Sequence, residues 1–265
     1  MARQPLLAVL LCAVIFICVP VVHAQYFKFD NAANDQQIKD EVEGILKYFS
    51  SLVGGGMFHT ADLHDFGGVD IGLTGTLSTV PSKFEGLPVF SEENLVGLAF
   101  LNASIGLPGN FELIGRFFYL PVGSSVDQDA VPVRSLDSRG GVTLIGGGLK
   151  YGLLQMPGVP KIMIMGTFHS LTVPDEFDFG NVSTISFKGV ISHSFPLITL
   201  FVGAGIDITR LELDDAFLNG DSFTETLPNA TVGARVQVLP LVHVNAAYNF
   251  SEFASFAFGA GLSIR

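Results

Sequence analysis

Few residues in this sequence have the types and spacing that catalysis requires. The sequence contains no Gly-x-Ser-x-Gly motif, the turn that presents the nucleophile in one large class of serine hydrolases. The candidate for lipase or acyltransferase chemistry is His193, which stands between Ser192 and Ser194. Such chemistry needs a histidine in contact with a serine or an acid. Because this group is a weak candidate, we predict that the protein is not an enzyme.

Metal-binding and phosphate-binding patterns are also weak. His59 and His64 share a polar stretch with Asp62 and Asp65, but the histidines lack the spacing of a metal-binding pair on a helix. A divalent cation could bind there, although a solvated loop explains the same residues more simply. The Gly-x-Gly motifs lie inside apolar stretches rather than at a strand-to-helix turn, so we do not expect them to bind phosphate. We predict no metal and no other cofactor.

A third group of polar residues is spread through otherwise apolar stretches: Glu112, Arg116, Lys150, His169, Lys188, Arg235 and His243. In a membrane barrel, a charge that faces lipid costs roughly 2–4 kcal/mol near the midplane, so these side chains should line the lumen. Opposite charges across a narrow lumen would pair and hold the barrel rigid, which we favour. The alternative is a polar track or a ligand clamp, where Leu144, Met163 and Met165 would suit an amphipathic ligand.

Hydrophobic periodicity indicates the elements that position these residues. After Gly67, apolar and polar residues alternate with a period of two, as in Val242 and Val244 against His243 and Asn245. Most of the alternating stretches reach the ~9–11 residues that a tilted strand needs to cross a membrane. The alternation predicts ten strands, over 67–79, 94–106, 110–120, 140–154, 161–173, 181–195, 197–213, 229–239, 241–250 and 253–265.

The connections between these strands distinguish a membrane barrel from a soluble β-sandwich. Short connections alternate with longer ones, as tight periplasmic turns alternate with external loops in outer-membrane barrels. We therefore predict an all-β fold, a transmembrane antiparallel up-and-down β-barrel of about 10–12 strands, with any additional strand within 55–62. The acidic run 213–225 is interpreted as a hydrated external loop. The short connections are 107–109, 155–160, Pro196 and Pro240, and the longer ones are 80–93, 121–139, 174–180 and 214–228.

One short amphipathic helix is predicted over residues 35–53. Its apolar residues, from Ile38 to Val53, recur at steps of three and four residues, and Gly54-Gly55-Gly56 would end it. Two positions are open for this helix. It would rest against the periplasmic end of the barrel, which we favour, or it would lie inside the lumen as a plug.

The composition supports a barrel that exposes apolar side chains to lipid. Hydrophobic residues make up 48% of the chain and charged residues only 15%, against roughly 25% charged residues in ordinary soluble domains. No stretch after residue 25 reaches the ~18 apolar residues of a membrane-spanning helix. The formal net charge of −11 argues against a nucleic-acid partner, which needs a basic surface.

The first residues have the pattern of a secretory signal. A basic start is followed by an apolar run and by Val22-His23-Ala24, which predicts cleavage between Ala24 and Gln25. Cys12 and Cys18 both lie within this segment, so the mature chain would have no cysteine. We expect a signal peptide over 1–24, a leader with the helix over 25–66 and the barrel over 67–265. The expected location is the bacterial outer membrane.

Three segments resemble a bacterial family of outer-membrane proteins of unknown function. They are GGGMFHTADLHDFGGVDIGLTGTLSTVP (54–81), LPGNFELIGRFFYLPV (107–122) and GGVTLIGGGLKYGLLQ (140–155). The family is similar in general plan to FadL-type transporters of hydrophobic compounds, which implies a transport-like role but no particular site residues. Outer-membrane barrels usually end in an aromatic residue that the assembly machinery reads, whereas this sequence ends in Ser263-Ile264-Arg265.

The resemblance and the mixed lumen together give the leading functional hypothesis. It is an outer-membrane barrel that binds or passes a hydrophobic or amphipathic small molecule. The alternative is a structural or surface-interaction protein with a filled lumen. In both cases the expected partners are outer-membrane lipid and the outer-membrane assembly machinery, with no nucleic acid.

Overall fold

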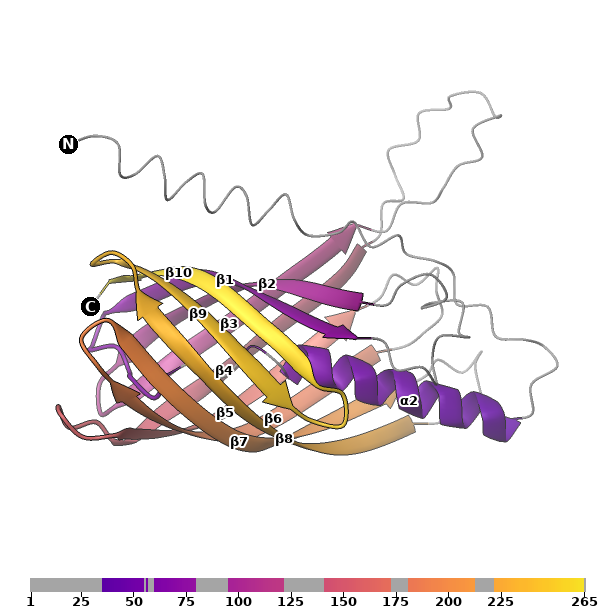
Figure 1. The fold of residues 1–265 in the computed structure, drawn as a ribbon. Coiled ribbons are helices and arrows are strands. Elements are labelled where there is room, and N and C mark those ends of the chain that lie inside the picture. The colour runs from indigo at the N-terminus through magenta and orange to yellow at the C-terminus, as the bar shows by residue number, and fades with distance from the viewer. Residues whose placement is uncertain are drawn as a thin grey trace, which may run out of the picture.

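The computed structural model describes residues 35–54, 56, 60–79, 95–121, 141–172, 181–212 and 222–264. These residues form one helix and ten strands, and the strands close into a barrel (Figure 1). In chain order the elements are α2 (Asp35–Gly54), β1 (Val69–Thr79), β2 (Leu95–Leu107), β3 (Phe111–Pro121), β4 (Gly141–Leu154), β5 (Lys161–Thr172), β6 (Asn181–Ser194), β7 (Ile198–Glu212), β8 (Ser222–Gln237), β9 (Val242–Phe250) and β10 (Ser255–Ile264).

Each strand pairs with its neighbours in the sequence, and the first and last strands close the circle. β1 pairs with β10 in antiparallel register from Val69 opposite Ile264 to Ser78 opposite Ser255. Since every other pair is also antiparallel and consecutive, the barrel has an up-and-down topology. The predicted fold class is therefore confirmed, with ten strands in the described part of the chain. The described residues within 55–62 are not strand.

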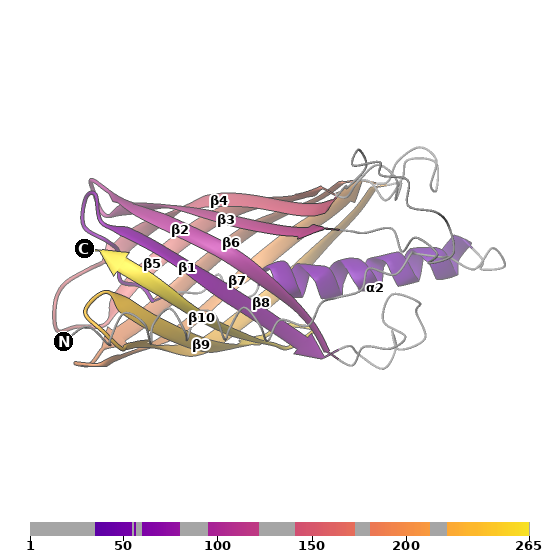
Figure 2. The same ribbon diagram turned by 90° about the horizontal axis from the view of Figure 1, so that it is seen from above.

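The strand connections sort to the two ends of the barrel as the sequence indicates. We call one end the turn end, where the short connections 108–110, 155–160, 195–197 and 238–241 join the strands. The opposite end is the loop end. It holds the short β9–β10 connection and the strand ends on either side of residues 80–94, 122–140, 173–180 and 213–221, which lie outside the described residues (Figure 2).

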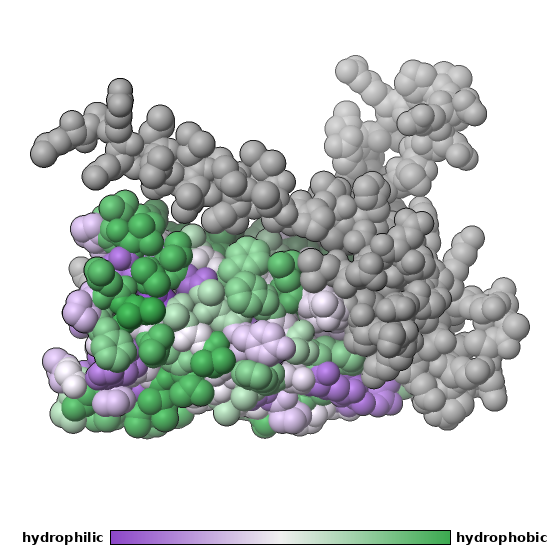
Figure 3. All heavy atoms as spheres, viewed as in Figure 1, coloured by the Kyte–Doolittle hydropathy of each residue, from purple (hydrophilic) through white to green (hydrophobic). Residues whose placement is uncertain are grey.

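The alternation places apolar side chains on the outer surface of the barrel. On β6, Ile185, Phe187 and Ile191 are exposed, whereas Ser186 and Lys188, which alternate with them, are buried. Many large apolar side chains lie on the outside in the same way, and the space-filling view shows them spread along the strands (Figure 3). A soluble sandwich buries its apolar face, so this inverted pattern is that of a transmembrane barrel.

The largest error in the predicted strand limits concerns β8. It was expected to begin at Asn229 after a hydrated loop, but it begins at Ser222 and pairs with β7 along its length. Pro228, which suggested the break, faces outward and lies before Ala230, where pairing with β9 begins. Because β8 has only one neighbour at that point, a residue without an N–H donor is tolerated there.

Helix α2 does not rest against the turn end, as we favoured, but enters the barrel from the loop end (Figures 1 and 2). The hydroxyl of Tyr48 donates to the carbonyl of Ser78 at the loop end of β1, over 3.0 Å. Burial raises the pKa of Tyr48 to about 12, so this donor stays neutral. The Tyr48 ring also packs edge-on against Phe253 in the β9–β10 connection. Among the described residues, no helix is long and apolar enough to cross a bilayer.

Beyond α2, the described residues 60–64 lie inside the barrel near the turn end, where β1 begins. Residues Thr60, Ala61, Asp62 and His64 are buried there. Most of the stretch that we interpreted as a solvated loop is therefore buried in the lumen, and we call residues 60–64 the plug segment. His59 lies outside the described residues.

Candidate functional site

The middle of the lumen holds the end of helix α2 between two cations of the barrel wall. A nitrogen of the Arg116 guanidinium donates to the carbonyl of Val53 over 2.8 Å, and the Lys188 ammonium donates to the carbonyl of Gly54 over 2.7 Å. The last carbonyls of a helix have no partner within the helix and carry its negative dipole end. Strands β3 and β6 therefore supply the cap that α2 itself lacks.

Both cations have further partners that fix their positions. Arg116 donates through Nε to Asn102 over 2.9 Å and lies 4.3 Å from the centre of the Phe100 ring. Lys188 forms an ion pair with Asp207 at 3.2 Å, and both side chains are almost fully buried. Gly54 is required at this point, because a Cβ there would collide with the Asp207 carboxylate.

Helix α2 fills the loop-end half of the lumen, where β2 and β4 to β7 present an apolar surface and Thr209 of β7 donates to the hydroxyl of Ser50. Leu46 and Val53 of the helix pack against an upper cluster on the inner wall. Phe49 of the helix and Phe118 of β3 add to the packing. The apolar face that makes the helix amphipathic is therefore buried inside the barrel. The wall residues of this upper cluster are Phe100, Leu144, Leu171, Val182 and Leu211.

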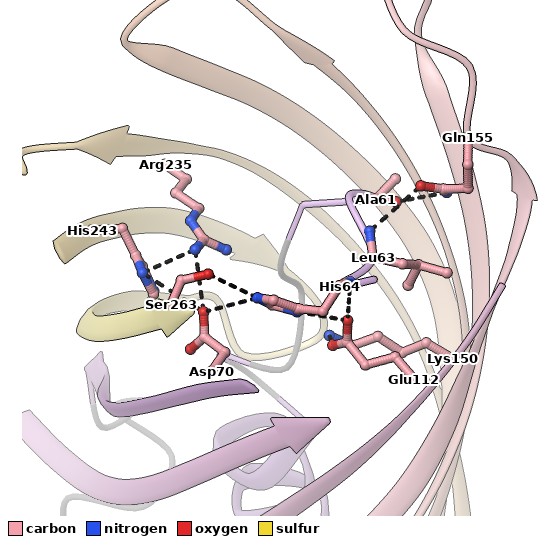
Figure 4. A network of polar contacts seen from close by, with 10 residues as sticks. All are labelled: Ala61, Leu63, His64, Asp70, Glu112, Lys150, Gln155, Arg235, His243 and Ser263. Atoms are coloured by element: carbon pink, nitrogen blue, oxygen red, sulfur yellow. Dashed lines mark hydrogen bonds and ion pairs between the residues drawn. The ribbon is translucent and has the colours of Figure 1, made fainter. Parts of the chain in front are cut away.

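The turn-end half of the lumen holds a polar network centred on His64 (Figure 4). Glu112 of β3 accepts from the backbone N–H of His64 and contacts the Nδ1 atom of its ring, both at 2.9 Å. The second oxygen of Glu112 pairs with Lys150 of β4 at 2.6 Å. All three side chains are nearly inaccessible to solvent, so each charge is neutralised inside the barrel.

The network continues on the other side of the His64 ring. Its Nε2 atom lies 2.8 Å from the hydroxyl of Ser263 on β10 and 3.8 Å from Asp70 on β1. Asp70 in turn pairs with Arg235 of β8 at 3.2 Å, and Arg235 contacts Nδ1 of His243 at 2.9 Å. The ring of His64 thus joins β3 to β10, two strands that β1 and β2 separate in the wall.

Residues next to His64 are bonded to side chains of the β4–β5 connection, of β5 and of β6. The backbone N–H of Ala61 donates to the Ser192 hydroxyl over 2.9 Å, and its carbonyl accepts from Gln155 over 2.8 Å. Asp62 pairs with Lys161 at 2.5 Å. The plug segment has no regular structure of its own, so these bonds replace the hydrogen bonds that a helix or strand would make.

The structure places the predicted lumen residues at two levels inside the barrel. Glu112, Lys150, Arg235 and His243 lie in the turn-end network, and Arg116, His169 and Lys188 lie in the middle of the lumen. His169 differs from the others, because neither ring nitrogen has a hydrogen-bond partner among the described residues. Its ring lies over Gly146, whose missing side chain makes room for it.

The serines and histidine that were considered for acyl transfer lie on different faces of β6. Ser192 points into the lumen toward Ala61, whereas His193 packs edge-on against Phe195 at a ring separation of 4.9 Å. Alternation along a strand sends neighbouring side chains to opposite faces, which separates this pair.

The lumen is largely filled in the described part of the chain. A cavity of about 40 Å³ lies beside the His64 network, lined by Thr60, Asp70 and Arg235 among others. A larger pocket of about 470 Å³ lies at the turn end, between the β6–β7 and β8–β9 connections. Asp62 and Ser263 form part of its lining.

Sequence reasoning missed the partners His64, Asp207 and Ser263. Asp207 occupies a polar inward position between apolar neighbours in β7, a signal that was available. The contact of His64 with Glu112 and Ser263 joins three distant parts of the sequence, so no local pattern announces it.

Comparison with solved structures finds barrels of low sequence identity. The chain is similar to the translocator domain of the autotransporter NalP from Neisseria meningitidis, with 14% identity, a TM-score of 0.39, and coverage of 93% of this chain and 100% of that one. It is also similar to the attachment invasion locus protein Ail of Yersinia pestis, with 13% identity, a TM-score of 0.34, and coverage of 75% of this chain and 99% of that one. For the toluene transporter TbuX of Ralstonia pickettii the identity is 10% and the TM-score 0.27, with coverage of 76% of this chain and 89% of that one. Similarity at this level carries no information on activity or ligands.

Comparison with curated proteins finds no match. A family model does match, over residues 84–264, and its description is a family of unknown function, DUF6588. The matched region runs from the segment before β2 to the end of β10 and so covers most of the barrel. The resemblance that the sequence motifs indicate is thereby confirmed, and the chain belongs to the family of unknown function DUF6588.

Proposed function

We propose that the protein is an outer-membrane barrel whose lumen is kept closed by its own N-terminal segment. The observation that carries this proposal is the filling of the lumen by the end of α2 at the loop end and by residues 60–64 at the turn end. The Arg116 and Lys188 side chains hold the end of α2 in the middle, and the Glu112 carboxylate holds His64 at the turn end. A water-filled pore requires an unobstructed polar route, which these contacts interrupt.

The outer surface supports a location in lipid. Every strand has exposed apolar side chains. Covering them with lipid lowers the free energy of the protein by ~25 cal/mol for each Å² of apolar surface removed from water. Outer-membrane lipid is therefore the proposed partner of the outer face. The predicted export signal and a barrel fold together favour insertion by the outer-membrane assembly machinery, with no role for nucleic acid.

Conductance in a planar lipid bilayer tests the closed lumen. The full mature chain should show no steady conductance. The double variant Arg116→Met/Lys188→Met should show openings, because it leaves the end of α2 without its cap in the middle of the lumen. Arg210→Met is the matched control, since Arg210 is exposed on the outside and pairs with exposed Glu212. A steady open-pore conductance of the unmodified protein would refute the proposal.

A second candidate function is the binding or passage of a hydrophobic or amphipathic small molecule. The observation that favours it is the division of the inner wall into an apolar upper cluster and a cationic level at Arg116 and Lys188. An amphipathic molecule would match this division, but α2 already occupies both parts. This function therefore requires α2 to move, and a disulfide that ties the helix to the barrel tests it.

A further inference from the structure

We propose that Ser263, His64 and Glu112 form a serine hydrolase triad at the turn end of the lumen. This activity goes beyond the proposed closure of the barrel, and the two can fail independently. A closed lumen requires only that the plug segment be held in place. It does not require that the histidine ring join a hydroxyl to a carboxylate.

The arrangement of atoms is the one that nucleophilic catalysis by serine needs. The acid contacts Nδ1 of His64 at 2.9 Å, and the serine hydroxyl lies 2.8 Å from Nε2 (Figure 4). In serine hydrolases the acid at Nδ1 fixes the tautomer that leaves Nε2 free to accept the serine proton. Glu112 at Nδ1 and Ser263 at Nε2 therefore occupy the positions that the acid and the serine have in such a triad.

The supporting contacts hold this geometry. Glu112 also accepts from the backbone N–H of His64, which fixes the ring relative to its own main chain. The ion pair between Glu112 and Lys150 holds the carboxylate from the other side. Ser263 is placed on β10 by the bond from its backbone N–H to the carbonyl of Leu241, at 2.8 Å. A triad requires such contacts to hold its side chains in position, because small displacements of the reacting groups lower the catalytic rate greatly.

A substrate site adjoins the serine. Ser263 lines the turn-end pocket of about 470 Å³, and Arg235 lines it as well. Arg235 is paired with Asp70, whose carboxylate lies 3.8 Å from Nε2 of His64, so its positive charge is close to the reacting atoms. Phe195 and Leu197 supply apolar walls. The site therefore fits a carboxylic ester with an apolar acyl group that enters from the turn end.

The reaction needs no reactant other than the ester and water. The Ser263 oxygen attacks the ester carbonyl carbon while Nε2 of His64 takes the hydroxyl proton, and the Arg235 guanidinium stabilises the oxyanion. The bond to the alcohol oxygen then breaks, and His64 returns the proton to the leaving alcohol. Water attacks the acyl-serine while His64 accepts a proton of the water; the bond to the Ser263 oxygen then breaks, His64 returns the proton to that oxygen, and the carboxylic acid is released. Glu112 is a positioning residue that orients His64 and stabilises its charged form.

A fluorophosphonate probe tests the nucleophile directly. The detergent-solubilised full mature chain should become labelled, and peptide mass spectrometry should locate the adduct on Ser263. Ser263→Ala should lose the label and His64→Gln should reduce it strongly, while the heat-dependent electrophoretic shift of a folded barrel is retained. Ser186→Ala is the matched control, because Ser186 is a buried lumen serine of β6 that lies outside both the turn-end pocket and the His64 network.

Hydrolysis of nitrophenyl butyrate tests the complete triad. Ser263→Ala should abolish turnover, and Glu112→Gln should lower kcat by roughly 100-fold or more with little change in KM. Glu112→Asp should recover part of the loss, which a merely structural role would not produce. Absence of both labelling and turnover in the folded protein would overturn the proposal and leave the network as an anchor of the plug. The planar-bilayer result would be unaffected by that outcome.

Discussion

The ammonium group of Lys188 on β6 lies 2.7 Å from the carbonyl oxygen of Gly54, the last residue of α2. The same ammonium pairs with Asp207 on β7, and its side chain is fully buried. One wall residue therefore joins the plug to a charge pair of the barrel. Substitution of Lys188 therefore removes both the contact with α2 and the ion pair within the barrel wall.

Lys188→Met should destabilise the barrel, because it leaves the Asp207 carboxylate and the Gly54 carbonyl buried without their cation. Breaking a buried ion pair on one side costs about 3–5 kcal/mol. Urea unfolding in lipid vesicles measures the change. The double variant Lys188→Met/Asp207→Leu should recover part of the loss, since the Asp207 carboxylate is then no longer buried without Lys188. Equal destabilisation by the single and double variants would contradict this account.

Gly54→Ala should also destabilise the protein, because the added methyl group would collide with the Asp207 carboxylate. Overpacking of a filled interior costs roughly 1–3 kcal/mol. Gly189→Ala is the control, since a Cβ at Gly189 meets nothing within 4 Å. The unfolding midpoints of both variants should be compared under identical lipid conditions. A Gly54→Ala midpoint equal to that of the control would show that the helix end is not tightly fitted.

Phe187→Arg should weaken insertion, because Phe187 is 55% exposed on the outer face in the middle of β6. An arginine near the bilayer midplane costs roughly 2–4 kcal/mol, and near the interface about 0–1 kcal/mol. Ile264→Arg, at the turn end of β10, should therefore have a small effect. Folding yield into vesicles measures both. Similar yields for the two variants would argue against lipid contact along β6.

A disulfide between α2 and the barrel tests whether small-molecule handling requires movement of the helix. The hydroxyls of Ser51 and Ser251 lie 3.2 Å apart, so Ser51→Cys/Ser251→Cys should form a disulfide in a chain prepared from Gln25 onward, which has no other cysteine. Binding of a fluorescent fatty acid should be lost after oxidation and recovered after reduction. Each single cysteine variant is a control. Unchanged binding in the locked protein would show that any such site lies elsewhere.

The sequence predicts the strands well because each strand has an apolar face against lipid and a more polar face against the interior. That contrast is local, as in Ile185 and Phe187 against Ser186, so a period of two reveals it. The start of β8 was wrong because Pro228 normally excludes a central strand. Only the pairing partners show that β8 has one neighbour at that point.

The position of α2 could not be predicted from its own residues. An amphipathic helix has the same apolar face whether it packs below a barrel or inside one. The decisive residues, Arg116 and Lys188, lie in strands far along the chain. The role of His64 was hidden for the same reason, since its bonds to Glu112 and Ser263 exist only after the barrel closes.

The seam between β1 and β10 has a consequence for the order of assembly. The plug leads directly into β1, and β1 completes the circle with the last strand. Val69 and Ile264 meet from opposite ends of the barrel sequence, so this contact has the largest loop-closure cost of any strand pair. If β1 and β10 pair last, α2 does not have to be threaded into a closed barrel. The sheet instead forms around the helix, and pairing of its two edge strands encloses it.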